Sequence, residues 1–283
     1  MLVIFSLALW AHASGGDLVG TIPKNEQVPD LPFRLYQGYL VVVEGRIGNL
    51  DHQNLLLDTG TSPSMVDASI ARKLGLHGKS DAIALFNQNV PAERVVLRDL
   101  QVGPLRPRDL EVMVADFSKL ASGMGMHLSG VIGLDALGSR SFTIDYKKQR
   151  ILFHASPQRH SAPFSAGPQF ISVSFNTGNR KLHLLLDTGT PRLVIFKEAL
   201  QDLDYEWSPA TGLGKNLSGA VSYRNIVIPG ATLGTANIGR QRASVVVDQK
   251  NLQSEYDGLI GISLLQPSQL SFDFERQVLG WSD

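Results

Sequence analysis

The tetrapeptide Asp-Thr-Gly-Thr occurs twice in this chain of 283 residues, at 58–61 and at 187–190. Two leucines precede each copy. Two aliphatic residues and a glycine follow at a matched distance, with Gly133 lying 75 residues (133 − 58) after the first aspartate and Gly261 lying 74 (261 − 187) after the second. A carboxylate on a glycine turn after an apolar strand is one half of a paired-carboxylate site. The chain therefore carries both halves.

The repeat extends beyond the tetrapeptides, and its pattern is that of β-strands. Runs of β-branched and aliphatic residues separated by polar turns lead into each aspartate, and Asn-Thr-Gly-Asn at 176–179 is a strong hairpin signal. Each half also ends with a similar pair of strands across a charged turn. The expected strands are 40–47, 54–57, 142–146 and 151–153 in the first half, and 170–175, 182–186, 270–274 and 278–281 in the second.

The sequence after each tetrapeptide predicts a short helix. Asp67 is placed to cap a helix over 68–74 that stops at Gly75, and the counterpart in the second half is expected over 197–203. The fold class expected is all-β, with two similar barrel lobes related by a pseudo-twofold, short helices and a cleft between the lobes. The expected division is a signal peptide over 1–13, a tether or propeptide over 14–31, a first lobe over 32–154, a linker over 155–168 and a second lobe over 169–283.

Composition excludes several classes of function. The formal net charge is zero and aromatic residues make up 7% of the chain, so neither nucleic acid nor an anionic membrane is expected as a partner. The absence of cysteine excludes disulfides, thiolate metal sites and cysteine nucleophiles. The seven histidines show no metal-ligand spacing, so we expect neither a metal nor a cofactor.

The first residues resemble an export signal. An apolar run over 2–10 is followed by Ala-His-Ala at 11–13, a pattern typical of a processing site before Ser14. The run is shorter than the ~20 apolar residues that cross a bilayer, and no later stretch is long enough either. We therefore expect an exported protein, periplasmic or secreted, without a transmembrane segment. The alternative is an ordinary buried first strand.

Asp58 and Asp187, brought together across a pseudo-twofold axis, would form a pair that performs acid–base chemistry. Two carboxylates about 3 Å apart do not both ionise readily, so the pair holds one proton. One aspartate then takes a proton from a bound water while the other protonates a carbonyl oxygen, which is what amide hydrolysis needs. The sequence does not assign the proton to either member.

The neighbouring residues fit this hypothesis. Gly60 and Gly189 would let the backbone of each loop approach the partner lobe. Thr59 and Thr188 would hydrogen-bond across the twofold axis and lock the two loops together. The hydroxyls of Thr61 and Thr190 would donate to the aspartate carboxylates. Buttressing of the loops is expected from aliphatic residues and glycines that follow in each half: Val131, Ile132 and Gly133, and Leu259, Ile260 and Gly261.

On these residues the chain resembles an aspartic protease of the pepsin/retropepsin type, and it is most similar to single-chain bacterial retropepsin-like proteases. Leu-Leu-Asp-Thr-Gly-Thr, the helix around 70–75 and Gly-Val-Ile-Gly-Leu at 130–134 carry the resemblance, which covers residues 32–283. It implies a six-stranded sheet between the lobes, catalytic Asp58 and Asp187 at their junction, and a β-hairpin flap. A pepsin-type flap tyrosine is not assigned, because no tyrosine lies between Tyr39 and Tyr146.

The function expected is an aspartic endopeptidase acting on polypeptides as a monomer with an intrachain pair. One alternative is a non-catalytic peptide-binding module, and another is a dimer whose pairs of aspartates form between chains.

The candidates for a flap over the cleft are residues 86–91 and 211–215. Asp145 and Asp273 are interpreted as turn residues and Asp135 as a helix cap. Because Thr61 and Thr190 should favour ionised carboxylates, an acidic pH optimum is expected.

Overall fold

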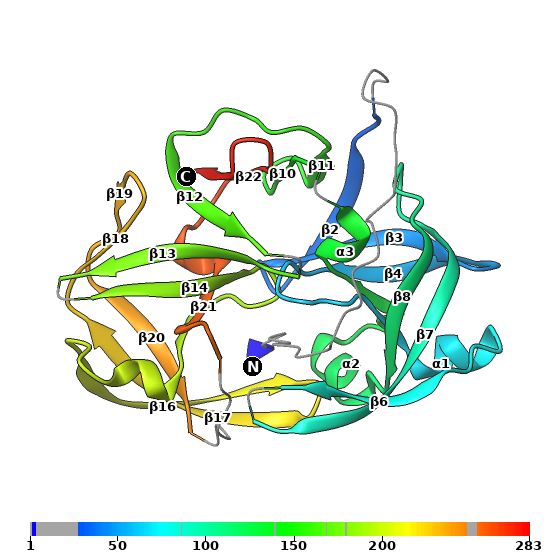
Figure 1. Cartoon of the computed structure of the whole chain (residues 1–283), viewed down its shortest axis with the longest axis horizontal. Coiled ribbons are helices and arrows are strands. Elements are labelled where there is room, and N and C mark those ends of the chain that lie inside the picture. The colour runs from blue at the N-terminus through cyan, green and yellow to red at the C-terminus, as the bar shows by residue number, and fades with distance from the viewer. Residues whose placement is uncertain are drawn as a thin grey trace.

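The computed structural model describes residues 2–3 and 28–283, except 86, 139, 168, 179 and 248–253. Two β-rich lobes lie side by side, with three short α-helices on the first (Figure 1). The expectation of an all-β chain with two similar lobes is confirmed. In the first lobe the elements are β2 (Leu31–Tyr36), β3 (Leu40–Ile47), β4 (Leu50–Leu57), β5 (Met65–Asp67), α1 (Ala68–Lys73), β6 (Lys79–Ala84), β7 (Asn89–Gln101), β8 (Arg108–Ala115), α2 (Ser118–Met124), β9 (Gly130–Ile132), α3 (Leu134–Leu137), β10 (Phe142–Asp145) and β11 (Arg150–Leu152).

The second lobe repeats this plan. The strands are β12 (His160–Ala166), β13 (Ile171–Thr177), β14 (Lys181–Asp187), β15 (Leu193–Ile195), β16 (Glu206–Asn216), β17 (Gly219–Ile228), β18 (Ala231–Leu233), β19 (Ala236–Asn237), β20 (Gln241–Val246), β21 (Gly258–Gly261), β22 (Gln269–Asp273) and β23 (Val278–Ser282). Two short 3₁₀ helices, η1 (Lys197–Leu200) and η2 (Ile262–Leu264), take the places of α1 and α3.

Strand pairing shows the internal symmetry most clearly. In the first lobe β4 pairs with β9 in parallel, β9 with β5 antiparallel, and β5 with β8 in parallel. The second lobe uses the same sequence of pairings, with β14 on β21, β21 on β15, and β15 on β20. Each aspartate loop therefore leaves its lobe at the same point of the same motif.

A sheet between the lobes joins the two halves. Six of the described strands follow one another in the order β2, β11, β10, β22, β23 and β12, three from each half of the sequence. The central β10–β22 contact stacks Phe142 on Phe272 with ring centroids 4.4 Å apart. Burying each such ring removes a large apolar area from water, so the contact is a main attachment between the lobes.

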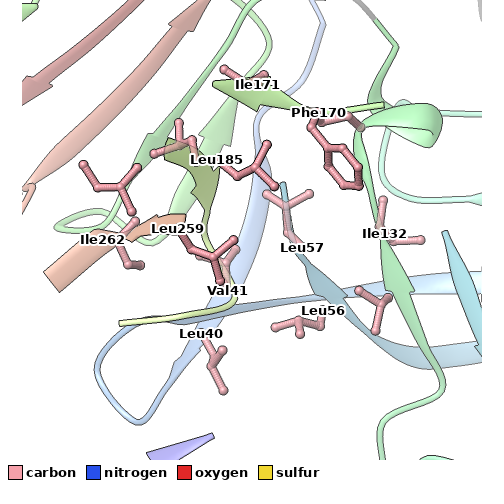
Figure 2. Packing of buried hydrophobic residues seen from close by; sticks show 14 of the residues in the cluster. Leu40, Val41, Leu56, Leu57, Ile132, Phe170, Ile171, Leu185, Leu259 and Ile262 are labelled. Atoms are coloured by element: carbon pink, nitrogen blue, oxygen red, sulfur yellow. The ribbon is translucent and has the colours of Figure 1, made fainter. Parts of the chain in front are cut away.

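Buried aliphatic side chains fill the region beneath the aspartate loops. Figure 2 shows Leu57 and Ile132 of the first lobe among the same packed side chains as Leu185 and Leu259 of the second. All four are at most 2% exposed. Burial of a leucine or isoleucine side chain contributes about 1.5–3 kcal/mol, so this packing supports the strands that end at the two aspartates.

Several expectations about individual segments change. The segment expected as a linker contains β12, which pairs with both β13 and β23 and so belongs to the folded sheet. The second-half helix is shorter than expected and is 3₁₀ over Lys197–Leu200, because Phe196 stands where Asp67 caps α1 and offers no side-chain acceptor. Asp67 caps α1 as expected, with its carboxylate accepting from the Ser69 N–H at 2.9 Å.

Asp145 and Asp273 hold equivalent turns, in agreement with their interpretation. Asp145 accepts from the N–H of Lys148 at 2.8 Å, and Asp273 accepts from the N–H of Arg276 at 3.0 Å. Each bond spans three residues and closes the turn that joins the last two strands of its half. Neither aspartate therefore belongs to the pair at the lobe junction.

The expected signal peptide and tether fall largely on residues 4–27, which lie outside the described residues. Leu2–Val3 is described as β1, a short strand parallel to β16. In the part of the chain that the structure describes, no helix is long and apolar enough to cross a membrane.

Candidate functional site

Asp58 stands at the end of β4, held by its own loop. Its N–H donates to the carbonyl of Ile132 on β9 at 2.9 Å. One carboxylate oxygen, Oδ1, accepts from the Gly60 N–H at 2.8 Å, and the other, Oδ2, accepts from the Thr61 hydroxyl at 2.7 Å. Both oxygens of this fully buried carboxyl therefore have a donor within the tetrapeptide.

Asp187 occupies the equivalent position on β14 but is held differently. Its Oδ1 accepts from the Gly189 N–H at 2.8 Å, as expected from the repeat. Among the described residues, neither its Oδ2 nor the hydroxyl of Thr190 has a hydrogen-bond partner. The expectation that Thr190 donates to this carboxylate is therefore wrong, and the two aspartates have unequal surroundings.

The two loops approach each other closely enough to exclude a side chain at Gly60. A Cβ atom built there would lie 2.6 Å from Cγ of Asp187 and 2.9 Å from its Oδ2. Such contacts are shorter than van der Waals separation, so any larger residue would displace the Asp187 carboxyl. The structure thus places the Asp187 carboxyl directly against the loop that carries Asp58.

Thr59 and Thr188 lock the loops together. The hydroxyl of Thr59 donates to the Leu186 carbonyl at 2.8 Å and accepts from the Thr188 N–H at 3.2 Å. The hydroxyl of Thr188 in turn donates to the Leu57 carbonyl at 3.3 Å and accepts from the Thr59 N–H at 3.0 Å. These four bonds are fully buried and symmetrical, so they fix the position of one lobe's loop relative to the other.

The predicted buttressing residues lie directly beside the loops. Val131 and Ile132 pair with the leucines before Asp58, and Leu259 and Ile260 pair with the leucines before Asp187.

The two glycines of these motifs lie where the backbone of the aspartate loop crosses closely. A Cβ at Gly133 would lie 2.1 Å from the Thr61 carbonyl oxygen, and a Cβ at Gly261 would lie 2.4 Å from the Thr190 carbonyl oxygen. Only glycine permits these crossings.

Burial raises the pKa of both aspartates, by unequal amounts. Loss of hydration raises the pKa of Asp58, but hydrogen bonds from Thr61 and Gly60 oppose this change. Asp187 has its pKa raised well above the ordinary value by loss of hydration and then by the neighbouring Asp58 charge. Of the two carboxyls, Asp187 therefore has the more strongly raised pKa.

Asp135 is part of the support for the first loop, which the sequence did not reveal. It was expected to cap a helix, but the N-cap of α3 is Gly133, and Asp135 instead accepts from the Ser64 N–H at 2.7 Å and from the Ser64 hydroxyl at 2.6 Å. The Ser64 hydroxyl in turn accepts from the Gly133 N–H at 2.9 Å. Ser263 stands at the corresponding place in the second lobe, so this support is present in one lobe only.

Replacing Asp135 with Ala should destabilise the fold. The substitution leaves the Ser64 N–H and hydroxyl without their acceptor in a buried place, at a cost of about 1–3 kcal/mol for each lost polar partner. We expect a lower free energy of unfolding in urea, measured beside Asp273→Ala, whose carboxylate holds a more exposed turn. An unchanged midpoint for Asp135→Ala would contradict the assigned role.

Two β-hairpins are the flap candidates. The candidate at 86–91 spans the turn between β6 and β7 and the start of β7, and its residue 86 lies outside the described residues. The candidate at 211–215 lies on β16 of the β16–β17 hairpin.

The two hairpins contact each other. Asn87 donates to the Ser218 hydroxyl at 3.0 Å and accepts from the Asn216 side chain at 3.2 Å. Lys119 on α2 donates to the Ser218 carbonyl at 3.1 Å. The tip of the second-lobe hairpin is thus fastened to the first lobe.

No group of His, Asp or Glu side chains with the geometry of a metal site occurs among the residues that the structure describes. The polar groups at the lobe junction are two carboxyls, their backbone amides and hydroxyls. This set can bind a water molecule and exchange protons with it.

Two Asp-Thr-Gly loops, crossed at the junction of two similar β lobes, define the fold and site of a single-chain retropepsin-like protein. A family model described as "Aspartyl protease" matches residues 43–136 and, again, 171–264. The chain therefore belongs to the aspartyl protease family. Each match contains one of the tetrapeptides and its distal glycine motif. No curated protein matches the chain.

Proposed function

We propose that the protein is an aspartic endopeptidase that hydrolyses peptide bonds with a water molecule activated between Asp58 and Asp187. The observation that carries the proposal is the pair of fully buried carboxyls at the crossing of the two loops, where a Cβ at Gly60 would lie 2.6 Å from Cγ of Asp187. The proposal is tested by incubating the purified chain with a mixed peptide library and identifying new termini by mass spectrometry. Cleavage is expected; complete absence of turnover, with retained peptide binding, favours the non-catalytic binding module.

We assign different roles to the two aspartates. Asp58 is ionised and takes a proton from the water, because Thr61 and Gly60 donate hydrogen bonds to its oxygens. Asp187 carries the shared proton and delivers it to the carbonyl oxygen of the scissile bond, since its Oδ2 has no donor among the described residues. The water oxygen then bonds to the carbonyl carbon. Collapse of the tetrahedral intermediate breaks the C–N bond as the amine takes the proton that Asp58 removed from the water, and Asp187 regains its proton from a hydroxyl of the intermediate.

A polypeptide substrate fits the edge of β16. Leu2 and Val3 pair with Gly214 and Lys215 on this strand, so the edge accepts an extended chain by backbone hydrogen bonding. For a substrate to enter, the tip of the β16–β17 hairpin would leave Asn87 and Lys119. The hairpin then serves as a flap that closes over the bound peptide.

The pH profile of hydrolysis should be bell-shaped, with Thr61 setting its acidic limb. Activity needs Asp58 ionised and Asp187 protonated, so it is lost at low pH as Asp58 protonates and at high pH as Asp187 ionises. Removing the Thr61 hydroxyl removes a bond that lowers the pKa of Asp58. In Thr61→Val the acidic limb of kcat/KM should therefore move to higher pH.

Thr190→Val is the matched control for this shift. Its hydroxyl has no partner among the described residues, so the acidic limb should stay in place. A wild-type profile that peaks above neutral pH, or equal shifts in both variants, would contradict the assigned roles.

We further propose that the protein is exported and acts as a monomer. The apolar run over 2–10 with small residues at 11–13 supports export. Both aspartates and both interlocking threonines come from one chain, which supports a site that needs no second copy. Processing after residue 13 would be read from the N-terminal sequence of the protein recovered from a culture, and an intact N-terminus would argue against the signal.

A further inference from the structure

Arg192 and Tyr223 form a cation–aromatic pair beside the second aspartate loop. Arg192 lies five residues (192 − 187) after Asp187, and its carbonyl accepts from the Gly261 N–H at 3.0 Å, which fixes its backbone to the loop support. Its guanidinium lies over the ring of Tyr223 on β17, 5.7 Å from the centroid. The two residues thus join the loop to the β16–β17 hairpin.

The polar atoms of this pair lack acidic partners. Arg192 is exposed, and none of the ion pairs among the described residues involves it. Tyr223 is 1% exposed, yet its hydroxyl has no hydrogen-bond partner in the described part of the chain. A buried hydroxyl without a partner costs about 1–3 kcal/mol, so an acceptor supplied by a ligand would stabilise this hydroxyl.

The ring of Tyr223 also lies over β16, the strand whose other side pairs with β1. Tyr223 is opposite Gly212 on β16, and its ring covers this glycine so closely that a Cβ there would lie 2.5 Å from Cε2. Gly214, where Leu2 pairs, is two residues further along the same strand. A peptide bound in this register and continued by two residues toward its N-terminus would therefore reach Gly212, beside Tyr223.

We propose that Arg192 and Tyr223 form a subsite that binds an acidic side chain of the polypeptide substrate. The guanidinium supplies a charged, forked donor for the carboxylate, and the tyrosine hydroxyl supplies a further one. The ring beneath the guanidinium holds it in place. This inference rests on the proposed endopeptidase function and names the substrate class of that site: peptides with Asp or Glu at one position near the scissile bond.

The first lobe lacks this feature, so the preference should be one-sided. The residue five after Asp58 is Pro63, which carries no charge. Acidic residues are therefore expected at a position on one side of the cleaved bond, without a symmetrical preference on the other. The pKa of Tyr223 is raised to about 12, mainly by loss of hydration, so its hydroxyl keeps its proton over the working range of pH.

Charge reversal tests the proposal. Wild-type protein should cleave peptides with Asp or Glu at one position about 10–100-fold faster, in kcat/KM, than matched peptides with Asn or Gln, the range expected for a bond to a charged group. Arg192→Glu should invert the preference toward Lys or Arg at that same position. Tyr223→Phe keeps the ring over Gly212, and it should reduce the acidic preference by raising KM.

Arg224→Glu is the matched control. Arg224 is the exposed neighbour of Tyr223 on β17, and its guanidinium stacks on Trp207 at 3.7 Å from the ring centroid. Because its side chain is engaged elsewhere, the cleavage preference should not change. An equal effect of Arg192→Glu and Arg224→Glu would mean that the general surface charge determines the cleavage preference, and this would overturn the proposed subsite.

A binding measurement separates this inference from the proposed function. Peptides that are acidic or neutral at the selected position are titrated into an Asp58→Asn chain, in which hydrolysis does not interfere. Tighter binding of the acidic peptide, lost in Asp58→Asn combined with Arg192→Gln, supports the subsite even if no turnover is found. Cleavage or binding without any acidic preference overturns the subsite and leaves the endopeptidase proposal intact.

Discussion

Asp58→Asn is expected to lower peptide hydrolysis by about 10²–10⁴-fold while the fold is retained. The amide keeps an oxygen for the Gly60 N–H but does not take a proton from water. The substitution also removes one of two fully buried carboxyls, each of which raises the free energy of ionising the other. The thermal midpoint should therefore be equal to or higher than that of the wild type, which separates loss of chemistry from loss of structure.

The controls for this result come from the same repeat. Asp187→Asn should be equally inactive, since the proton donor is then lost. Asp273→Asn changes an aspartate that is also matched between the halves, but its carboxylate closes a turn, so hydrolysis should be unaffected. Retained cleavage in Asp58→Asn would exclude it from the reacting pair.

Thr59→Val is expected to be the most destabilising isosteric change at the lobe junction. Valine keeps the shape but leaves two buried groups, the Leu186 carbonyl and the Thr188 N–H, without a partner. With about 1–3 kcal/mol for each such group, the free energy of unfolding should fall by about 2–6 kcal/mol. Activity should fall as well, because the position of one aspartate relative to the other depends on this lock.

Two further variants make the cause specific. Thr59→Ser retains the hydroxyl and should recover most of the stability and activity. Thr232→Val, on the exposed side of β18, removes a hydroxyl with no place in the lock and should have little effect. If Thr59→Val unfolds at the same urea concentration as the wild type, the four bonds do not join the lobes as described.

The sequence predicts the repeated part of this molecule well, because local patterns determine it. The strand at 40–47, the helix capped by Asp67 and the closing hairpins follow from alternation, capping and turn residues, and the structure has each of them within a few residues. The meeting of Asp58 with Asp187 could be inferred because the two halves have nearly equal spacing, and similar lobes pair naturally about a twofold axis.

Features that differ between the two halves were harder to predict from the sequence. Thr190 matches Thr61 in sequence, yet its hydroxyl does not hold the aspartate, since that depends on how the loops cross in space. The bond of Asp135 to Ser64 spans 71 residues, and the pairing of β12 with β23 spans more than one hundred, so no local pattern reports them. The Arg192–Tyr223 contact is of the same kind: it joins a loop to a hairpin that only tertiary structure brings together.

The most direct test of the central claim is the stoichiometry with which a peptide analogue binds when a tetrahedral hydroxyl replaces its scissile carbonyl. Such an analogue engages both members of a carboxyl pair, so calorimetric titration counts working pairs. We predict one analogue bound per chain, with binding greatly weakened in Asp58→Asn and in Asp187→Asn. One analogue per two chains, or undiminished binding in both variants, would contradict an intrachain pair of aspartates.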